Sequence, residues 1–442
     1  MDDDRADAPG AKYVLFLLGC VYAINIADRY VMSVLIEPIK ADLHLTDSAV
    51  AFLTGFALAV FYITAGIPIA TLADRTNRTR LIAFALGAWS LLTALCGLTR
   101  TFWQLVAARV LVGVGEAGGT PPSCSLISDY FGWRRRALAL SIYSVGASVG
   151  SMVGAGAGYV SDQWRWRSVF FVLGIPGIIL AVLISLTVRE PPRGRLDAMA
   201  APAQAASFWD VLRYCGHTPP MLHALAGSFL YCVWAWGLMW WTPSYLVRSL
   251  HMTLTGAGQS LALMNGIGGT IVLFATSAIM KALSGADVRS VPRFIAAACI
   301  IGTPASIVAF TAHSQFVALA ALWVFVPVIY AVFGPPYSMM QNLVPAPMRA
   351  QAMALLLMVS NIGNLIVAPQ LVGALSDALG ARFGSESLRM ALLPLTLLGL
   401  WAAAHWWMSG RQLAEGMARA GNLPADVSRV AIPSLARPSS SP

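Results

Sequence analysis

Apolar segments recur along the whole chain, and this repetition limits its possible folds more than any other feature. We place twelve of them at residues 13–36, 49–73, 80–98, 102–124, 136–160, 168–188, 223–247, 256–281, 293–312, 315–340, 350–376 and 387–409. Each has the ~20 residues that a helix needs to cross the ~30 Å hydrocarbon core of a bilayer. Lipid offers backbone amides no partners, so segments without the alternation of barrel strands must be helical. The sequence therefore predicts an all-α polytopic membrane protein with twelve transmembrane helices.

The composition and the charge distribution agree with this interpretation. Of 442 residues, 57% are hydrophobic and 11% are charged, whereas soluble domains are about 45–50% apolar and about 25% charged. With both termini inside, 20 Lys and Arg residues fall in inside segments, 7 fall outside, and the other two of the 29 lie in the membrane. The positive-inside rule then predicts cytoplasmic termini and an inner (plasma) membrane location. The net charge of +9 follows from these loops and implies no nucleic-acid partner.

The chain divides into two sets of six segments joined by a polar linker. We expect a cytoplasmic tail (1–12), a first six-helix half (13–188), a cytoplasmic linker (189–222), a second six-helix half (223–409) and a disordered cytoplasmic tail (410–442). The linker is rich in Pro, Ala and charge, and the tail ends in "ARPSSSP", a composition that is typical of disorder.

The two halves also repeat short motifs. "TPPSCS" at 120–125 is answered by "GPPYSM" at 334–339, and "GYVSD", which ends at Asp162, is answered by "GALSD", which ends at Asp377. Two pseudo-symmetric halves with a site between them are typical of secondary transporters. We therefore expect a transporter with two pseudo-symmetric halves.

Other function classes lack support in the sequence. The six cysteines show no paired spacing, and the six histidines are scattered, so neither a disulfide framework nor a metal site is expected. There is no nucleophile motif of an enzyme, and no G-x-x-x-x-G-K-[ST] loop that a nucleotide-driven pump would need. We therefore expect that the protein is not an enzyme and needs no cofactor. We also expect a monomer that contacts the lipid bilayer.

Several motifs resemble those of the major facilitator superfamily. "ADRTNRTR" at 73–80 is similar to its Asp-Arg-x-Gly-Arg loop, although Ala70 and Asn77 stand where glycines are usual. "RVLVGVGEA" from Arg109 resembles the motif of its fourth helix. "GASVGSMVG" supplies small residues for close helix contact at Gly146, Gly150 and Gly154. Together with "DRY", "RRRALALSIYSVG" and "WRWRSVFF", these motifs look most like the spinster-like branch. The resemblance implies the twelve-helix fold of two halves and transport of small molecules.

Four charged residues lie inside the predicted spans of the first half: Asp28, Arg29, Arg109 and Glu116. Counting depth along the first and fourth spans puts Arg109 level with Asp28 and Arg29, and Glu116 roughly 10 Å deeper. Ionisable groups in a membrane usually face the bundle interior and pair with one another. We therefore predict a charged cluster of zero net charge between these two spans.

Two interpretations of this cluster remain open. It either pins two helices together, or it forms a proton switch in which Asp28 and Glu116 bind protons and Arg29 and Arg109 are their partners. Glu116 lies too deep for Arg109 to satisfy it without movement, which favours the switch. The spinster-like resemblance also implies proton-linked transport at these acidic positions.

A second charged set lies in the predicted cytoplasmic loops. It either sets the topology and forms surface pairs, or holds a cytoplasmic gate shut. Its members are Asp74, Arg75, Arg78, Asp129, Arg135 and Arg136.

The second half has amides and aromatic rings instead of charges in its spans. The candidates for lining a cavity are Trp240, Tyr245, Asn265, Tyr337, Asn361 and Asn364. Asn361 and Asn364 are three residues apart and share a helical face, for hydrogen bonds between helices or for the cavity. Two arginines opposite aromatic residues suit a small organic anion with an apolar body. The branch resemblance implies lysophospholipid or sphingoid-phosphate export as the alternative.

Overall fold

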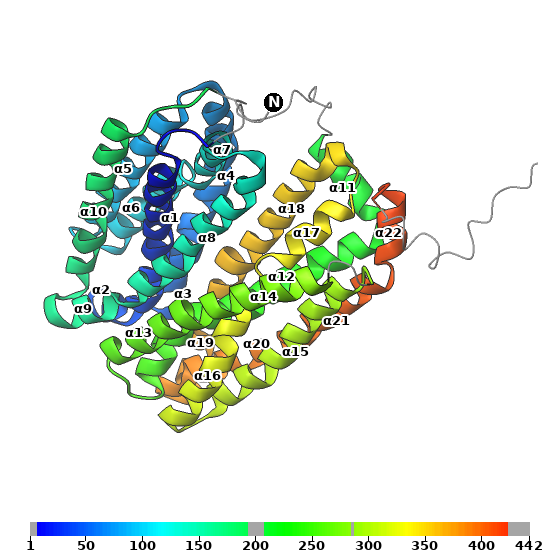
Figure 1. Ribbon diagram of the computed structural model, residues 1–442. Coiled ribbons are helices and arrows are strands. Elements are labelled where there is room, and N and C mark those ends of the chain that lie inside the picture. Colours follow the sequence, from blue (N-terminus) through cyan, green and yellow to red (C-terminus); the bar gives the residue numbers. More distant parts are fainter. Residues whose placement is uncertain (1–6, 193–206, 284–286, 423–442) are drawn as a thin grey trace, which may run out of the picture.

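The computed structural model describes residues 7–192, 207–283 and 287–422, and these residues are helical with no strand. Nine helical stretches within them are long and apolar enough to cross a membrane, and the longest, 351–411, contains two successive spans. Together with shorter helices that run on from one another, they make six spans in each half. The predicted all-α fold of twelve spans in two halves is confirmed (Figure 1).

The first half is built from ten α-helices and one π-helical turn. They are α1 (Ala11–Val34), α2 (Ile36–Leu43), α3 (Asp47–Ala51), η1 (Phe52–Phe56), α4 (Ala57–Arg75), α5 (Arg78–Cys96), α6 (Phe102–Glu116), α7 (Thr120–Tyr130), α8 (Trp133–Ala155), α9 (Ala157–Trp164) and α10 (Trp166–Thr187). The stretches α3 to α4, α6 to α7 and α8 to α9 each form one span.

The second half follows the same plan. Its spans are α12 (Pro219–Arg248), α13 (Leu254–Leu263) with η2 (Met264–Gly268) and α14 (Gly269–Leu283), α15 (Ser290–Thr311), α16 (Gln315–Tyr330) with α17 (Pro335–Asn342), α18 (Arg349–Asn361) with η4 (Ile362–Val367) and α19 (Ala368–Phe383), and α20 (Ser387–Thr396) with α21 (Leu398–Arg411). Short turns η3 (Ala346–Met348) and η5 (Gly384–Glu386) lie between them.

The repeated Pro-Pro motif marks equivalent interruptions of the fourth span of each half. Pro121 and Pro335 lie in the first turn of α7 and α17, where a missing backbone N–H costs least. Three residues separate the end of α6 from the start of α7, and four separate the end of α16 from the start of α17.

Two short helices lie in segments that the sequence assigns to linker and tail. Helix α11 (Phe208–Gly216) begins at a capping box formed by Ser207 and Asp210 and buries Val211 and Cys215. Helix α22 (Leu413–Arg419) buries Leu413 and Met417. The prediction of disorder from residue 410 was therefore wrong for this helix, because its apolar side chains pack against the second half. Residues 1–6, 193–206 and 423–442 lie outside the described residues.

Helix α1 owes its position to the glycines of α8. A Cβ atom at Gly146, Gly150 or Gly154 would overlap a backbone carbonyl oxygen of α1. The small residues thus let the two helices touch backbone to backbone, as predicted from their spacing. This contact fixes the helix that carries Asp28 and Arg29.

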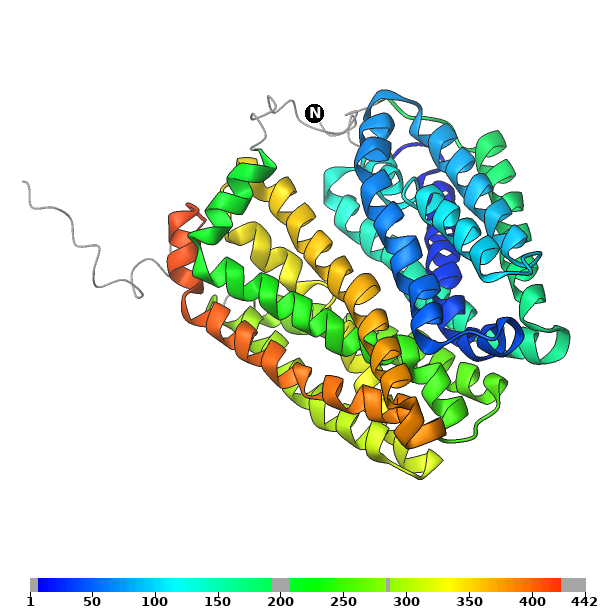
Figure 2. The ribbon, with the colours of Figure 1, turned by 180° about the vertical axis from the view of Figure 1, so that it is seen from behind.

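The two halves meet at one end of the molecule. Figures 1 and 2 show α2, α3 and α9 of the first half beside α13 and α19 of the second, at the end away from the first described residues and α22. We call this the far end, and the opposite end, where α11 and α22 lie, the terminal end.

Candidate functional site

The four charged residues in the first half form two buried ion pairs. Arg109 Nη1 of α6 donates to Asp28 Oδ2 of α1 at 2.9 Å, and Thr93 Oγ1 of α5 donates to Asp28 Oδ1 at 3.1 Å. Arg29 Nε donates to Glu116 Oε2 at 2.7 Å. The structure thus brings together all four residues that the sequence grouped.

The pairing differs from the depth estimate in one respect. Glu116 lies beyond Arg109, as expected, but its partner is Arg29, whose long side chain extends toward it from α1. A depth counted along helix axes ignores side-chain length, and an arginine side chain covers about one helical turn of depth. Arg29 is also the only one of the four with an accessible side chain, at 15% exposed, against 0% for Glu116 and Arg109.

The cluster is incompletely satisfied. Among the described residues, Glu116 Oε1 and the Nε and Nη2 atoms of Arg109 are buried with no hydrogen-bond partner. The carboxyl groups of Asp28 and Glu116 also lie close enough to interact. Burying like charges side by side is costly, and a proton on either carboxyl group would remove that repulsion and supply a donor.

Hydrogen bonds that begin at Tyr30 join the first half to the second. Tyr30, the neighbour of Arg29, accepts a bond of 3.0 Å from Asn265 Nδ2, and Tyr330 donates to Asn265 Oδ1 at 2.8 Å. The Tyr30 ring also packs against Trp240, whose Nε1 donates to Asn364 Oδ1 at 2.7 Å. Asn265 lies in the π-helical turn η2 and is fully buried.

A cavity of about 130 Å³ lies inside the second half, next to this chain of bonds. Its lining includes Tyr337, Asn361 and Asn364 from the predicted set, with Trp236 and Phe333 as apolar neighbours. Tyr245 lies elsewhere: its hydroxyl donates to Ala309 O at 2.8 Å and its ring packs on Phe310. It belongs to the packed core of the second half, because aromatic composition alone does not tell a core face from a cavity face.

The charged set at the terminal end makes its described contacts within the first half. Arg78 pairs with Asp129 at 2.5 Å and with Glu190 at 2.6 Å. Arg135 pairs with Asp7 at 2.9 Å.

The other members of that set are Arg136, Arg75 and Asp74. Arg136 Nη2 donates to Ser128 O at 2.8 Å, and Arg75 is exposed. The side chain of Asp74 lies outside the described residues. These contacts brace α5, α7 and α8, and the role of this set as a gate stays a prediction.

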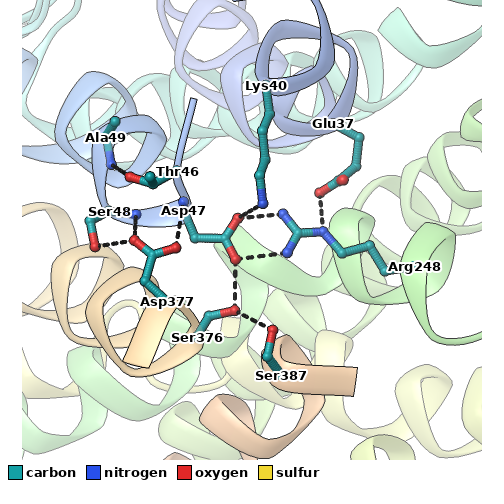
Figure 3. Close-up of polar contacts among 10 residues, drawn as sticks. All are labelled: Glu37, Lys40, Thr46, Asp47, Ser48, Ala49, Arg248, Ser376, Asp377 and Ser387. Atoms are coloured by element: carbon teal, nitrogen blue, oxygen red, sulfur yellow. Dashed lines mark hydrogen bonds and ion pairs between the residues drawn. The ribbon is translucent and has the colours of Figure 1, made fainter. Parts of the chain in front are cut away.

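At the far end, an ionic network that sequence reasoning missed joins the halves (Figure 3). Arg248 of α12 holds Asp47 of α3 through two bonds of 2.6 and 2.7 Å, and Glu37 through a third of 2.7 Å. Lys40 donates to Asp47 at 2.6 Å, and Ser376 of α19 donates to it at the same distance. These bonds stabilise the ionised form of a carboxylate that is 2% exposed.

Nothing in the sequence separates these residues from ordinary charges at the ends of spans. Asp47 and Arg248 are 201 positions apart, and only the fold brings them together. The signal that was visible was the repeated Gly-x-x-Ser-Asp motif, since Ser376 and Asp377 of the second copy both contact α3.

Comparisons with known proteins agree with this architecture. A family model of the Major Facilitator Superfamily matches residues 18–368. An MFS-type efflux pump of Mycolicibacterium smegmatis is 30% identical over 93% of this chain and 96% of its own length. Protein spinster homolog 3 of Danio rerio is 24% identical over 83% of this chain and 77% of its own length.

Solved structures give the same result. A bacterial homolog of the human lysosomal transporter Spinster, in an inward-facing and unoccupied conformation, superposes with a TM-score of 0.82 and 27% identity over 93% of this chain and 99% of that one. A D-xylose-proton symporter superposes with a TM-score of 0.67 at 16% identity, over 89% of this chain and 96% of that one, and shares the fold. With two pseudo-symmetric halves, a charged core and these relatives, the chain belongs to the major facilitator superfamily of membrane transporters, in its spinster-like branch.

Proposed function

We propose that the protein is a proton-coupled secondary transporter that moves a small organic anion with an apolar body by alternating access. The observation that carries this proposal is the pair of buried ion pairs, Asp28 with Arg109 and Arg29 with Glu116, in the membrane part of the first half. Ionisable groups there are expensive and usually serve ion or proton pathways.

The proton-binding role falls to Glu116 and Asp28. Their carboxyl groups interact, and Glu116 Oε1 lacks a donor among the described residues. Protonation of either one relieves the repulsion between them and weakens the hold on Arg29 or Arg109. Proton binding then biases the equilibrium between two conformations by the difference in proton affinity between them.

Arg29 binds the substrate anion in this proposal, because its guanidinium is the accessible one in the cluster. Released from Glu116, that group would offer a planar fork to a carboxylate or phosphate. The apolar body of the substrate would lie against the aromatic and amide lining of the cavity in the second half.

The orientation follows from the distribution of basic residues. We propose that the terminal end faces the cytoplasm, which puts Arg78, Arg135 and Arg136 on the inside in agreement with the positive-inside rule. The far end then faces outward and is closed by the Asp47–Arg248 network. The structure then corresponds to an inward-facing state, which the superposition with an inward-facing relative supports.

The test is proton flux in proteoliposomes without ATP. Purified protein is reconstituted around a pH-sensitive dye, and aryl- and alkyl-carboxylates that raise its melting temperature are added one at a time. Each transported anion should move protons, and Glu116→Gln should abolish that movement while substrate still stabilises the fold. Anion uptake with no proton movement would remove the coupling from the proposal.

An amphiphile exporter is the second candidate, favoured by the similarity to an efflux pump and to spinster proteins. The same charges would then hold a phosphate headgroup and the cavity an acyl chain. Lysophosphatidate in place of the short carboxylates tells the two apart: stabilisation and export of the lipid alone would favour this candidate.

A further inference from the structure

The repeated Gly-x-x-Ser-Asp motif has a matching pair of contacts across the two halves. In the first copy, Asp162 Oδ2 of α9 accepts from Thr255 N at 2.9 Å and Thr255 Oγ1 at 2.5 Å. In the second copy, Asp377 Oδ2 of α19 accepts from Ser48 N at 2.8 Å and Ser48 Oγ at 2.5 Å. Each aspartate thus binds the second residue of a helix, α13 or α3, in the opposite half (Figure 3 for Asp377).

The receiving helices begin in the same way. Thr253 Oγ1 accepts from Gly256 N at 3.0 Å, and Thr46 Oγ1 accepts from Ala49 N at 3.2 Å. The four N–H groups at a helix start lack partners within the helix. Here the threonine of the receiving half satisfies one of them. The aspartate from the opposite half satisfies another in α13, through Thr255 N, and two in α3, through Asp47 N and Ser48 N.

The glycine of each motif completes the contact. A Cβ atom at Gly158 would overlap the carbonyl oxygen of Leu254, and one at Gly373 would overlap that of Asp47. Glycine and aspartate are four residues apart, on one face of the helix. The glycine lets the backbones meet, and the aspartate then reaches the helix start, where a negative charge is favoured.

We propose that these two motifs form a symmetric pair of clamps that hold the far end shut, and that both must release before the transporter opens there. The first clamp consists of Gly158 and Asp162 on Leu254 and Thr255, and the second of Gly373 and Asp377 on Asp47 and Ser48. Asp162 and Asp377 are positioning residues: they bind no substrate and act through the helices that they cap.

The clamps differ in one respect that bears on their strength. Leu254 occupies the place of Asp47, so only the second clamp adjoins the network of Arg248, Lys40 and Glu37. In the described part of the chain, the polar contact of the first clamp is that of Asp162 with Thr255. Loss of Asp162 therefore removes the polar contact described for that side, whereas loss of Asp377 leaves Asp47 bound to Arg248.

Distances between spin labels test the proposal without substrate or proton gradient, so its failure is separate from failure of the proposed function. Labels are attached to an introduced keto amino acid, which leaves the six native cysteines in place. One pair replaces the exposed residues Arg100 and Ser314 at the far end, and a second replaces Arg80 and Gln341 at the terminal end. The variants are Asp162→Ala, Asp377→Ala and both together, because alanine removes the accepting oxygen whereas asparagine would keep one.

Asp162→Ala should raise the population with a long far-end distance about fivefold, because loss of a helix-capping side chain costs about that factor. Asp377→Ala should raise it by less, since Arg248 still holds Asp47, and the double variant should exceed either single variant. The terminal-end distance should shorten in the same molecules. Asp42→Ala is the matched control, since Asp42 is a far-end carboxylate whose ion pair, with Arg167 at 2.7 Å, stays within the first half. Unchanged distances in the double variant, or an equal shift in the control, would overturn the proposal.

If the double variant does not fold, Gly158→Ala and Gly373→Ala give the second measurement. The added methyl groups wedge the helices apart without touching a charge. Both should populate the open far end, and closed-state distances in both variants would also overturn the proposal.

Discussion

Arg29 Nε lies 2.7 Å from Glu116 Oε2, in an ion pair between helices α1 and α6 whose acid is fully buried and whose base is partly accessible. The neighbouring pair, Asp28 with Arg109, is buried on both sides. In the proposed function, this difference separates the two arginines: Arg109 neutralises Asp28, and Arg29 exchanges Glu116 for the substrate anion.

Glu116→Gln should abolish proton-driven accumulation while leaving expression and substrate-induced stabilisation largely intact. The glutamine resembles the protonated acid in shape and removes the repulsion with Asp28. Uptake into proteoliposomes under an imposed pH gradient measures the loss. Counterflow of substrate without a gradient is the control, and it should persist. Gradient-driven uptake at the wild-type rate would remove Glu116 as a coupling residue.

Arg29→Ala should weaken anion binding about tenfold or more, because it removes the accessible guanidinium and one charge-assisted bond. Arg29→Lys keeps the charge but loses the planar guanidinium, so its anion affinity should lie between those of wild type and Arg29→Ala. Binding is followed by substrate-dependent change in melting temperature. Equal affinity in wild type and both variants would place the anion away from α1.

Arg109→Ala should lower stability more than affinity. It leaves Asp28 as a buried, unpaired carboxylate, and breaking a buried pair on one side typically costs about 3–5 kcal/mol. Adding Asp28→Asn should recover part of the loss, since the remaining group is then neutral. Chemical denaturation in detergent would measure the free energy of unfolding of wild type, Arg109→Ala and the double variant. A double variant less stable than Arg109→Ala would contradict this account.

Gly150→Ala should destabilise the first half by about 1–3 kcal/mol, because the added methyl overlaps the Ala23 carbonyl oxygen of α1. Gly19→Ala on the facing helix is the control, since nothing lies within 4 Å of its new methyl group. Thermal unfolding should separate the two variants. Similar melting temperatures would show that α1 and α8 relax without cost.

The sequence was informative where a residue type conflicts with its surroundings. Four charged residues stand out in the apolar spans: Asp28, Arg29, Arg109 and Glu116. The free-energy cost of an unpaired charge in the membrane is enough to predict that they pair. Which acid meets which base was not predictable, because it depends on side-chain reach. Asp47 and Arg248 did not stand out in this way, because charged residues are common at the ends of transmembrane spans.

The repeated motif shows the other limit. "GYVSD" and "GALSD" were recognisable as an internal duplication, which predicted two similar halves. That each aspartate caps a helix of the opposite half depends on how the halves dock, and docking is not encoded in either motif alone. Tyr245 was misplaced for a related reason: helical periodicity does not distinguish the packed core of the second half from the lining of its cavity.

The hydrogen bond between Tyr30 and Asn265 gives the last prediction. Tyr30 follows Arg29 on α1, so we predict that movement of the charge cluster reaches the second half through this bond of 3.0 Å. Tyr30→Phe removes the hydroxyl but keeps the ring against Trp240, and Asn265 Nδ2 retains its bond of 2.7 Å to Leu261 O. The stability cost should therefore be small, about 0.5–1.5 kcal/mol.

We expect Tyr30→Phe to reduce the conformational response to pH more than it reduces the stability of the fold. In wild type, acidification from about pH 8 to 5 should shift the far-end distance distribution, and a difference of one pKa unit between the two states corresponds to a tenfold change in population. Tyr30→Phe should reduce the amplitude of this shift while its melting temperature stays near wild type. Asn265→Leu, which also removes the acceptor of the Tyr330 hydroxyl, should reduce it further. A wild-type amplitude in both variants would mean that the proton signal crosses between the halves by another route, and the bond would then serve packing alone.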